Sequence, residues 1–357
     1  MINSTSIIEI KTKNIIHNYK TLSKLAKNSI TAAVIKANSY GLGDLEVFNL
    51  LFKNGCNHFF LATTEEAIKI RKINKKAKLY VLNGFENNKI ETYFKNKLIP
   101  ILNSIEEIDK YINSSFSKTN LKIGIHVETG LNRLGVNLKD LKSKKIKKID
   151  LEILISHFAS ADEIKNKYSN VQNQKFKKYI NLFKSIKYKS LSNSAGIINN
   201  DQFQYDMIRP GISLYGTHDN YSLNQKIKLK PVIKLKGMIL QIKAIEKNQY
   251  VGYNKTYKTK SIIKVAVVGI GYADGISRII SNKGFVYFKE EKFKIIGRIS
   301  MDSMTINITK SKYNLKVGNY MEIINEKNDI QKIAEMFDTI PHEVLTSISK
   351  RVQRKYI

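Results

Sequence analysis

Lys36 is the residue whose position in this sequence most directly suggests chemistry. It closes the apolar run TAAVIK (residues 31–36), which reads as a buried strand, so its amine is expected at the carboxyl end of that strand. An amine there is costly to desolvate unless it is used, and a covalent imine with an aldehyde cofactor is a common use. The alternative is a lysine whose long side chain simply reaches solvent from the strand end.

Eight apolar runs that read as strands alternate with amphipathic stretches between about residues 12 and 216. The runs are 31–36, 58–62, 78–82, 98–102, 121–127, 151–156, 189–193 and 205–209. Eight β/α repeats predict an α/β fold with an N-terminal (β/α)8 TIM-type barrel, although a doubly wound open sheet gives a similar pattern. In a barrel, Lys36 would lie at the rim that carries active sites.

Helical patterns lie between most of these runs. Residues 13–27 have apolar side chains every three or four positions, at Ile16, Tyr19, Leu22 and Ala26. A second helix is expected after Thr63 and Thr64, whose hydroxyls are typical of helix caps. The segment SNSAGIINN (192–200) reads as a strand end followed by a serine-capped helix, which would present free amides to an anion.

The character of the sequence changes after residues 217–231. The runs that follow, 232–245, 262–273, 284–297 and 319–325, are β-rich and are separated by glycine and charged turns. We therefore predict a barrel over residues 1–225 and a mainly β domain over residues 226–357. The first few residues are candidates to pair with the second domain.

The net charge of +31 raises the question of nucleic-acid binding. Only seven of the 61 basic residues are arginine, however, and the lysines are spread along the whole chain beside isoleucine and asparagine. Proteins that recognise bases or phosphates favour arginine, because its guanidinium makes two hydrogen bonds at once. An AT-rich coding bias would enrich lysine, isoleucine and asparagine without any binding partner. We therefore expect no nucleic-acid partner.

Other features bear on the cell compartment. The chain has no run of eighteen apolar residues, and its first residues lack the pattern of a signal peptide, so we expect a cytoplasmic protein without membrane contact. The single cysteine, Cys56, lies in the apolar stretch FKNGCNHFFLA and is expected to be a packed thiol. We expect no metal site.

The surroundings of Lys36, AVIKANSYG, resemble the cofactor-lysine motif of alanine racemases. Further blocks follow in the order found in that family: ETGLNRLGV (128–136), SHFASADE (156–163), SNSAG (192–196), MIRPGISLYG (207–216), VGYNKTY (251–257), GIGYADG (269–275) and IGRISMD (296–302). The resemblance extends from about Lys36 to Arg351. One block could arise by chance, but eight in order are hard to explain otherwise.

The resemblance implies an enzyme that uses pyridoxal 5'-phosphate (PLP) and works as a homodimer, in which the β domain completes the active site of the other subunit. Lys36 would carry PLP as a Schiff base and act as one of two acid/base groups. Tyr253, arriving from the opposite chain, would be the other. Removing a proton on one face and returning one on the opposite face inverts a stereocentre. The implied activity is racemisation of alanine, consistent with supplying D-alanine for peptidoglycan.

Two further residues match family positions that tune this chemistry. By resemblance, Arg209 faces the pyridine nitrogen of PLP, where a guanidinium cannot accept a proton and leaves the ring a weaker electron sink. A weaker sink favours racemisation over transamination or decarboxylation. A tyrosine base needs a cationic neighbourhood, and His157 and Arg209 match the residues that supply it.

The remaining site residues also follow from the resemblance. The phosphate would be held by the hydroxyls of Tyr40 and Ser194 and by the backbone amides of Gly211 and Ile212. Arg133 is expected near the cofactor phenolate and the substrate carboxylate. The backbone at Met301, from the opposite chain, is expected to help hold that carboxylate.

The sequence departs from the family pattern at four positions. His126 stands where many members have a lysine that is often carbamylated, which leaves the orientation of Arg133 open. Lys350 stands where some members have a tyrosine that contacts the phosphate. Leu42 replaces a usual histidine, and Ser300 a common cysteine.

Other readings stay open at this point. A PLP-dependent decarboxylase of similar fold would usually place an acidic residue where Arg209 stands, and a broad-specificity racemase would differ only in its substrates. A non-catalytic PLP carrier would need the barrel alone, whereas this chain also has the second domain. A nucleic-acid-binding protein would keep its affinity after mutation of Lys36, with a steep salt dependence.

Overall fold

The computed structural model describes residues 4–86, 89–119, 121–142, 149–163, 165–217 and 227–357. The chain forms two compact units, Ile15–Lys230 and Met1–Asn14 together with Pro231–Ile357. The boundary expected between residues 225 and 226 lies outside the described residues.

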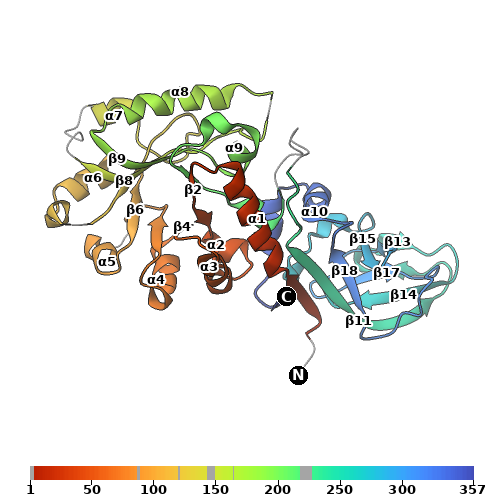
Figure 1. Ribbon diagram of the computed structural model, residues 1–357. Coiled ribbons are helices and arrows are strands. Elements are labelled where there is room, and N and C mark those ends of the chain that lie inside the picture. The colour runs from red at the N-terminus through yellow and green to blue at the C-terminus, as the bar shows by residue number, and fades with distance from the viewer. Residues whose placement is uncertain (1–3, 87–88, 120, 143–148, 164, 218–226) are drawn as a thin grey trace. The chain divides into compact units, whose positions relative to one another are not determined.

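The first unit is built on parallel strands that follow one another in sequence order (Figure 1). One sheet contains β3 (Ala33–Val34), β4 (His58–Leu61), β5 (Lys78–Val81), β6 (Ile99–Leu102), β7 (Gly124–His126), β8 (Asp150–Ile155) and β9 (Ser185–Ser190). β10 (Met207–Ile208) pairs in parallel with β2 (Ile30–Thr31), directly before β3. The backbone N–H of Arg209 donates to Ser192 O beyond β9. β10 therefore joins both sides of the sheet, and the predicted barrel is confirmed.

Helices cover the outside of these strands, as Figure 1 shows for α3, α4, α5, α6 and α8. The helices of this unit are α1 (Thr12–Leu25), α2 (Lys36–Tyr40), α3 (Asp44–Lys53), α4 (Thr64–Ile73), α5 (Ile90–Lys95), α6 (Ile105–Ile112), α7 (Leu138–Lys142), α8 (Tyr168–Ile180) and α9 (Ser194–Asn199). Strands β4 and β6 are buried at every position. A parallel strand covered on both faces reads as a continuous apolar run, which is why these strands were predictable.

Two local expectations differ from the structure. Helix α1 buries Ile15 rather than Ile16, together with Tyr19 and Leu22, because the side chain of Asn18 also turns inward to donate to Leu214 O and Lys230 O. Helix α9 is capped by Asn193, whose side chain accepts the N–H of Gly196, and not by a serine. The caps at Thr63 and the buried thiol of Cys56 are confirmed.

The second unit contains a closed antiparallel barrel. Its six strands pair in the cyclic order β11 (Ile233–Ile245), β14 (Ile263–Val268), β17 (Met304–Asn307), β16 (Glu291–Ile296), β15 (Phe285–Phe288) and β18 (Tyr320–Ile324). The thirteen residues of β11 make closure possible, since its first half pairs with β18 and its second half with β14. The predicted mainly β domain is confirmed.

Further elements extend this unit. β1 (Ser6–Ile10) pairs antiparallel with β11 and parallel with β19 (Gln353–Tyr356). The strands β12 (Tyr250–Val251) and β13 (Tyr257–Lys258) form a hairpin, and the helices are α10 (Ile330–Phe337) and α11 (Pro341–Ser347).

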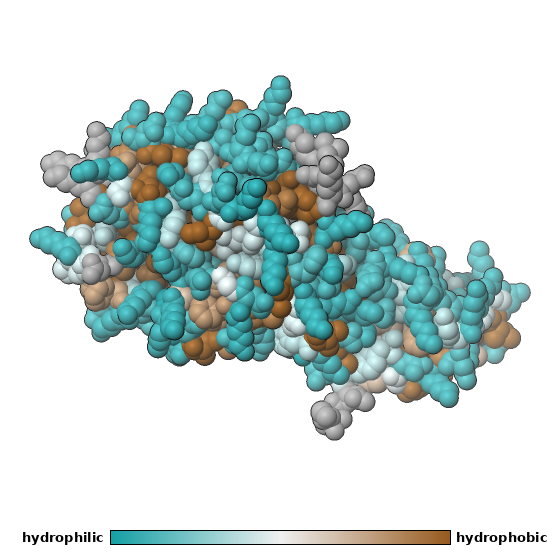
Figure 2. Space-filling model, viewed as in Figure 1, coloured by the Kyte–Doolittle hydropathy of each residue, from teal (hydrophilic) through white to brown (hydrophobic). Residues whose placement is uncertain are grey.

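The face of the molecule in Figure 2 is covered largely by hydrophilic side chains, with only scattered apolar patches between them. Such a surface fits the large excess of lysine in the sequence. No helix within the described ranges is both long and apolar enough to span a membrane.

Candidate active site

Lys36 begins an unusual turn at the carboxyl end of the first barrel strand. The four residues that follow it, Ala37 to Tyr40, all have left-handed backbone conformations, with φ of 53°, 55°, 52° and 56°. Such a conformation costs an L-residue roughly 1–2 kcal/mol. The N–H groups of Gly41 and Gly43 close the turn by donating to Ala37 O and Asn38 O. Backbone strain of this kind clusters at functional sites.

The side chain of Lys36 is partly buried. Burial is the main cause that lowers its pKa, and the positive charge of Arg133 adds to this effect. Glu66 acts in the opposite direction. A lowered pKa leaves more of the amine unprotonated at neutral pH, which is the nucleophilic form that an imine requires.

Arg209 is a buried cation, with only 5% of its surface exposed. Its guanidinium donates to Ser190 Oγ and to Ser156 O, both at 2.5 Å, and lies over the ring of Phe60. Burial lowers the pKa of Arg209 to about 9, so it keeps its charge at neutral pH. Among the described residues no carboxylate pairs with it. A buried charge without a counter-ion is costly, and an anionic or electron-rich ligand would offset that cost.

His157, just beyond β8, does not carry the charge expected of it. Burial, followed by the positive charges of Arg209 and Arg133, lowers the pKa of His157 well below its ordinary value. The imidazole is therefore neutral at physiological pH. Its backbone carbonyl accepts from the buried side chain of Gln172. The positive charge of this region comes instead from the two arginines.

The residues expected to hold a phosphate lie together. Ser194 Oγ accepts the N–H groups of Gly211 at 3.0 Å and Ser213 at 3.2 Å, so its own proton is free to be donated. A Cβ on Gly211 would lie 2.3 Å from the hydroxyl oxygen of Tyr40, so only glycine lets that hydroxyl approach the backbone. Ile212 follows and is buried. The side-chain hydroxyl of Ser213 is also buried and lacks a partner.

Arg133 projects from the loop after β7. The loop is closed at its base, where the N–H of Val136 donates to the carbonyl oxygen of His126 at 2.9 Å. Arg133 itself is exposed, yet its charge lowers the pKa values of both Lys36 and His157. The predicted barrel residues therefore share one rim of the barrel, at the carboxyl ends of its strands.

Tyr253 and Met301 belong to the second unit. Both are well exposed, at 62% and 53%. Tyr253 lies between the two strands of the β12–β13 hairpin. The preceding residue, Gly252, lies close to the backbone of Arg298, because a Cβ added to Gly252 would be 2.8 Å from the nitrogen of Arg298. The loop with Tyr253 thus packs against the start of the segment that carries Met301.

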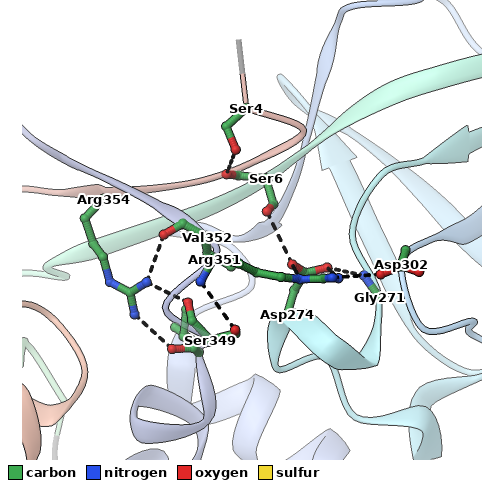
Figure 3. Close-up of polar contacts among 10 residues, drawn as sticks. Ser4, Ser6, Gly271, Asp274, Asp302, Ser349, Arg351, Val352 and Arg354 are labelled. Carbon is green, nitrogen blue, oxygen red and sulfur yellow. Dashed lines mark hydrogen bonds and ion pairs between the residues drawn. The ribbon is translucent and has the colours of Figure 1, made fainter. Parts of the chain in front are cut away.

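A salt-bridge network joins Asp302, the residue after Met301, to Arg351 and Asp274 (Figure 3). Arg351 donates to both carboxylate oxygens of buried Asp274, at 2.8 and 3.0 Å, and also pairs with Asp302 at 2.8 Å. The carboxylate of Asp274 also accepts the N–H of Gly271, and the N–H of Ala273 donates to Met301 O. The exposed side chain of Lys350, next to Arg351, takes no part in these contacts.

Sequence reasoning missed three residues that support these sites. Asn103 lies against His126, Asp274 anchors Arg351, and Glu66 contacts the turn after Lys36. Glu66 had a visible signal in the sequence, because it lies three residues after Thr63 in TTEE (63–66), which is the spacing of a capping box. No sequence signal marked the contact of Glu66 with the distant turn after Lys36.

Comparison with known proteins agrees with this geometry. Residues 10–219 match the family model described as "Alanine racemase, N-terminal domain", and residues 232–356 match "Alanine racemase, C-terminal domain". The alanine racemase of Rickettsia canadensis is 36% identical over 363 residues, which cover 99% of each chain.

Solved structures agree as well. The alanine racemase from Bartonella henselae with covalently bound pyridoxal phosphate is 33% identical, with a TM-score of 0.93 and coverage of 99% of this chain and 100% of that one. The biosynthetic alanine racemase from Pseudomonas aeruginosa is 25% identical, with a TM-score of 0.90 and the same coverage. With both domain models matched along nearly its whole length, this chain belongs to the alanine racemase family of enzymes.

Proposed function

We propose that the protein is a PLP-dependent racemase that interconverts L-alanine and D-alanine in the cytoplasm and so supplies D-alanine for peptidoglycan. The observation that carries the proposal is the position of Lys36. It is a largely buried amine with a lowered pKa, held at the barrel rim by a strained turn, with Arg209 and the Ser194–Gly211 contact on the same rim. Family membership supports the same reading.

The residues present fit PLP. A phosphate needs hydroxyl and amide donors, and Tyr40 and Ser194 carry hydroxyls while Ile212 carries a backbone amide. The amide of Gly211 donates to Ser194 Oγ in this structure and would turn to the phosphate only if that hydrogen bond opened. The hydroxyl of Ser213 beside them is buried and has no hydrogen-bond partner within the protein. Such a group is expected where a bound ligand supplies the partner. When bound, PLP supplies the electron sink that makes the Cα–H bond of an amino acid acidic.

The side chains then have separate tasks. Lys36 Nζ holds or releases a proton on one face of the substrate, and the hydroxyl of Tyr253 does so on the other. Arg209 keeps its proton and donates hydrogen bonds without accepting any. Arg133 offers a fixed positive charge to the substrate carboxylate.

Tyr253 and Met301 would reach this site from the partner subunit of a homodimer, with domains corresponding to residues 1–225 and 226–357. Their exposure within their own unit supports this arrangement, because an exposed tyrosine and methionine are available to another chain.

Reduction of the loaded protein with borohydride, followed by peptide mapping, tests the proposal. The label should lie on Lys36, and Lys36→Ala should abolish both the label and the near-visible absorbance. Lys72→Ala, which removes an exposed lysine of α4, is the matched control and should retain both. Label on another lysine would refute the assignment.

The preferred substrate needs a separate measurement. A pocket separates amino acids that differ by one methylene or hydroxyl only about 10- to 200-fold. A coupled assay over a panel of L- and D-amino acids should give alanine the highest kcat/KM. A higher value for another amino acid would replace alanine in the proposal.

A further inference from the structure

We propose that Glu66, in the first turn of α4, is a positioning residue that fixes the turn carrying Lys36. Its Oε1 accepts the backbone N–H of Ala37 at 2.7 Å, and its Oε2 accepts the N–H of Ala62 at 2.8 Å. One carboxylate thereby joins the chain after β3 to the chain after β4. The catalytic consequence rests on the proposed role of Lys36, whereas the contact itself does not.

The turn needs such a partner at its beginning. A left-handed turn of L-residues is strained and persists only where its surroundings hold it. Its later part is closed by its own backbone, through the N–H groups of Gly41 and Gly43. The N–H of Ala37 is at the start, where a helical turn offers no acceptor of its own. Glu66 supplies that acceptor from another element.

Glu66 is itself held in place. Thr63 Oγ1 accepts the N–H of Glu66, and the Glu66 carboxylate reaches back to the N–H of Thr63, which completes a capping box on α4. The carboxylate therefore sits on a rigid helix end and has little freedom to leave Ala37. This differs from an ordinary capping box, whose carboxylate serves only its own helix.

The negative charge of Glu66 also acts on the amine. Among the described residues, the charged and titratable groups that act on Lys36 are Arg133, Glu66 and the neutral His157. Arg133 opposes protonation of the Lys36 nitrogen, and Glu66 favours it. Removing the Glu66 charge leaves the arginine unopposed, so the nitrogen should lose its proton at lower pH.

The first test uses the cofactor-free protein and hydrogen exchange of the peptide 36–44, measured by mass spectrometry. Glu66→Gln cannot accept from both Ala37 and Ala62 with its single amide oxygen, so exchange there should be about tenfold faster or more. Glu65→Gln removes an exposed carboxylate from the same helix turn and should stay within about twofold of wild type. Unchanged exchange in Glu66→Gln overturns the proposal.

A second variant separates positioning from helix capping. Thr63→Ala weakens the cap of α4 but leaves the Glu66 carboxylate present. If this variant loosens peptide 36–44 as much as Glu66→Gln does, the effect comes from the helix end and the proposal is wrong. Slower exchange than in Glu66→Gln supports it.

The second test titrates the near-visible absorbance of the PLP-loaded protein. The midpoint should fall by about one pH unit in Glu66→Gln and by less than about 0.3 in Glu65→Gln. An unshifted midpoint in Glu66→Gln overturns the electrostatic part of the proposal. If wild type shows no such absorbance, the proposed function fails, while the exchange experiment still decides whether Glu66 positions the turn.

Discussion

The imidazole Nδ1 of His126 lies 3.0 Å from the side-chain oxygen of Asn103. Both protons of the Asn103 amide are used, since its nitrogen donates to Leu82 O and Ile101 O at 2.8 Å. Its oxygen can therefore only accept, so Nδ1 of His126 carries the proton and Nε2 keeps a lone pair. Burial and the nearby charges of Arg209 and Arg133 lower the pKa of His126 to about 3.

We predict that His126 stays neutral, as the Nδ1–H tautomer, from pH 5 to pH 8. Nitrogen-15 NMR of histidine-labelled protein measures this directly, with the resonance assigned by its loss in His126→Gln. Asn103→Asp should raise the pKa of His126, because a carboxylate beside Nδ1 favours the imidazolium. A wild-type midpoint near 6.5 would contradict the prediction.

The stability of the barrel should fall as the pH drops below 6.5. His58 lies at the start of β4, and a hydrogen bond of 2.9 Å joins its Nδ1 to the hydroxyl oxygen of Tyr80. Burial lowers the pKa of His58 to about 4. Between pH 6.5 and 4 the unfolded chain binds a proton that the folded chain does not, so unfolding becomes more favourable as pH falls. At pH 5 this costs about 2 kcal/mol for such a histidine.

His58→Gln should therefore lose about 2 kcal/mol less than wild type between pH 7 and pH 5, measured by urea denaturation. Tyr80→Phe removes the hydrogen bond but keeps the titrating imidazole, so it should retain most of the pH dependence. Equal pH dependence in wild type and His58→Gln would show that another group is responsible.

Arg209→Glu should raise the ratio of keto acid to inverted amino acid. A carboxylate can accept a hydrogen bond from a pyridinium N–H and so favours the protonated ring, which is a stronger electron sink and favours transamination. Arg209→Gln is the control. Its neutral side-chain amide keeps a hydrogen-bond donor for Ser156 O but has no negative charge to stabilise a pyridinium. Chromatography of the products gives the ratio. The same ratio in Arg209→Glu and wild type would contradict the role of Arg209.

A mixture of Lys36→Ala and Tyr253→Phe chains should regain activity that neither has alone. Each homodimer lacks one acid/base group at both sites and should be about 10²- to 10⁴-fold slower. Random reassortment of equal amounts makes about half of the dimers heterodimers, each with one intact site, so about a quarter of all sites recover. If mass analysis confirms heterodimers and activity does not rise, both groups come from one chain.

The fold was predictable where burial is uniform. Strands such as His58–Leu61 are covered on both faces, so their apolar runs are visible in the sequence. Helix faces are less certain, because two inward hydrogen bonds from Asn18 accompany a buried face of α1 that includes Ile15 and not Ile16. The neutral state of His157 was not predictable, since its lowered pKa depends on burial first and then on arginines, and only the fold supplies both.

The site was also predictable only in part. Lys36, Ser194 and Arg209 lie within four residues of the ends of β3, β9 and β10, and parallel strands bring their carboxyl ends to one rim. The carboxylate of Glu66 accepts the backbone N–H groups of Ala37 and Ala62, which almost every residue type possesses, so no sequence pattern marks these partners. The left-handed turn after Lys36 was also hidden, because Ala37 and Ser39 are not residue types that favour such a conformation.

Strand β1 has a consequence for how the chain is made. Ser6 pairs with Gly237, and Ile10 pairs with Tyr356, so the whole barrel is translated between β1 and its neighbours. Apart from β10, which pairs with β2, the barrel strands pair with near neighbours in sequence and can assemble as they leave the ribosome. β1 stays unpaired until β11 and β19 have been made, and until then its apolar residues and backbone groups are accessible to other chains. For this chain the order of synthesis and the order of assembly differ, and a strand made early is secured only near the end.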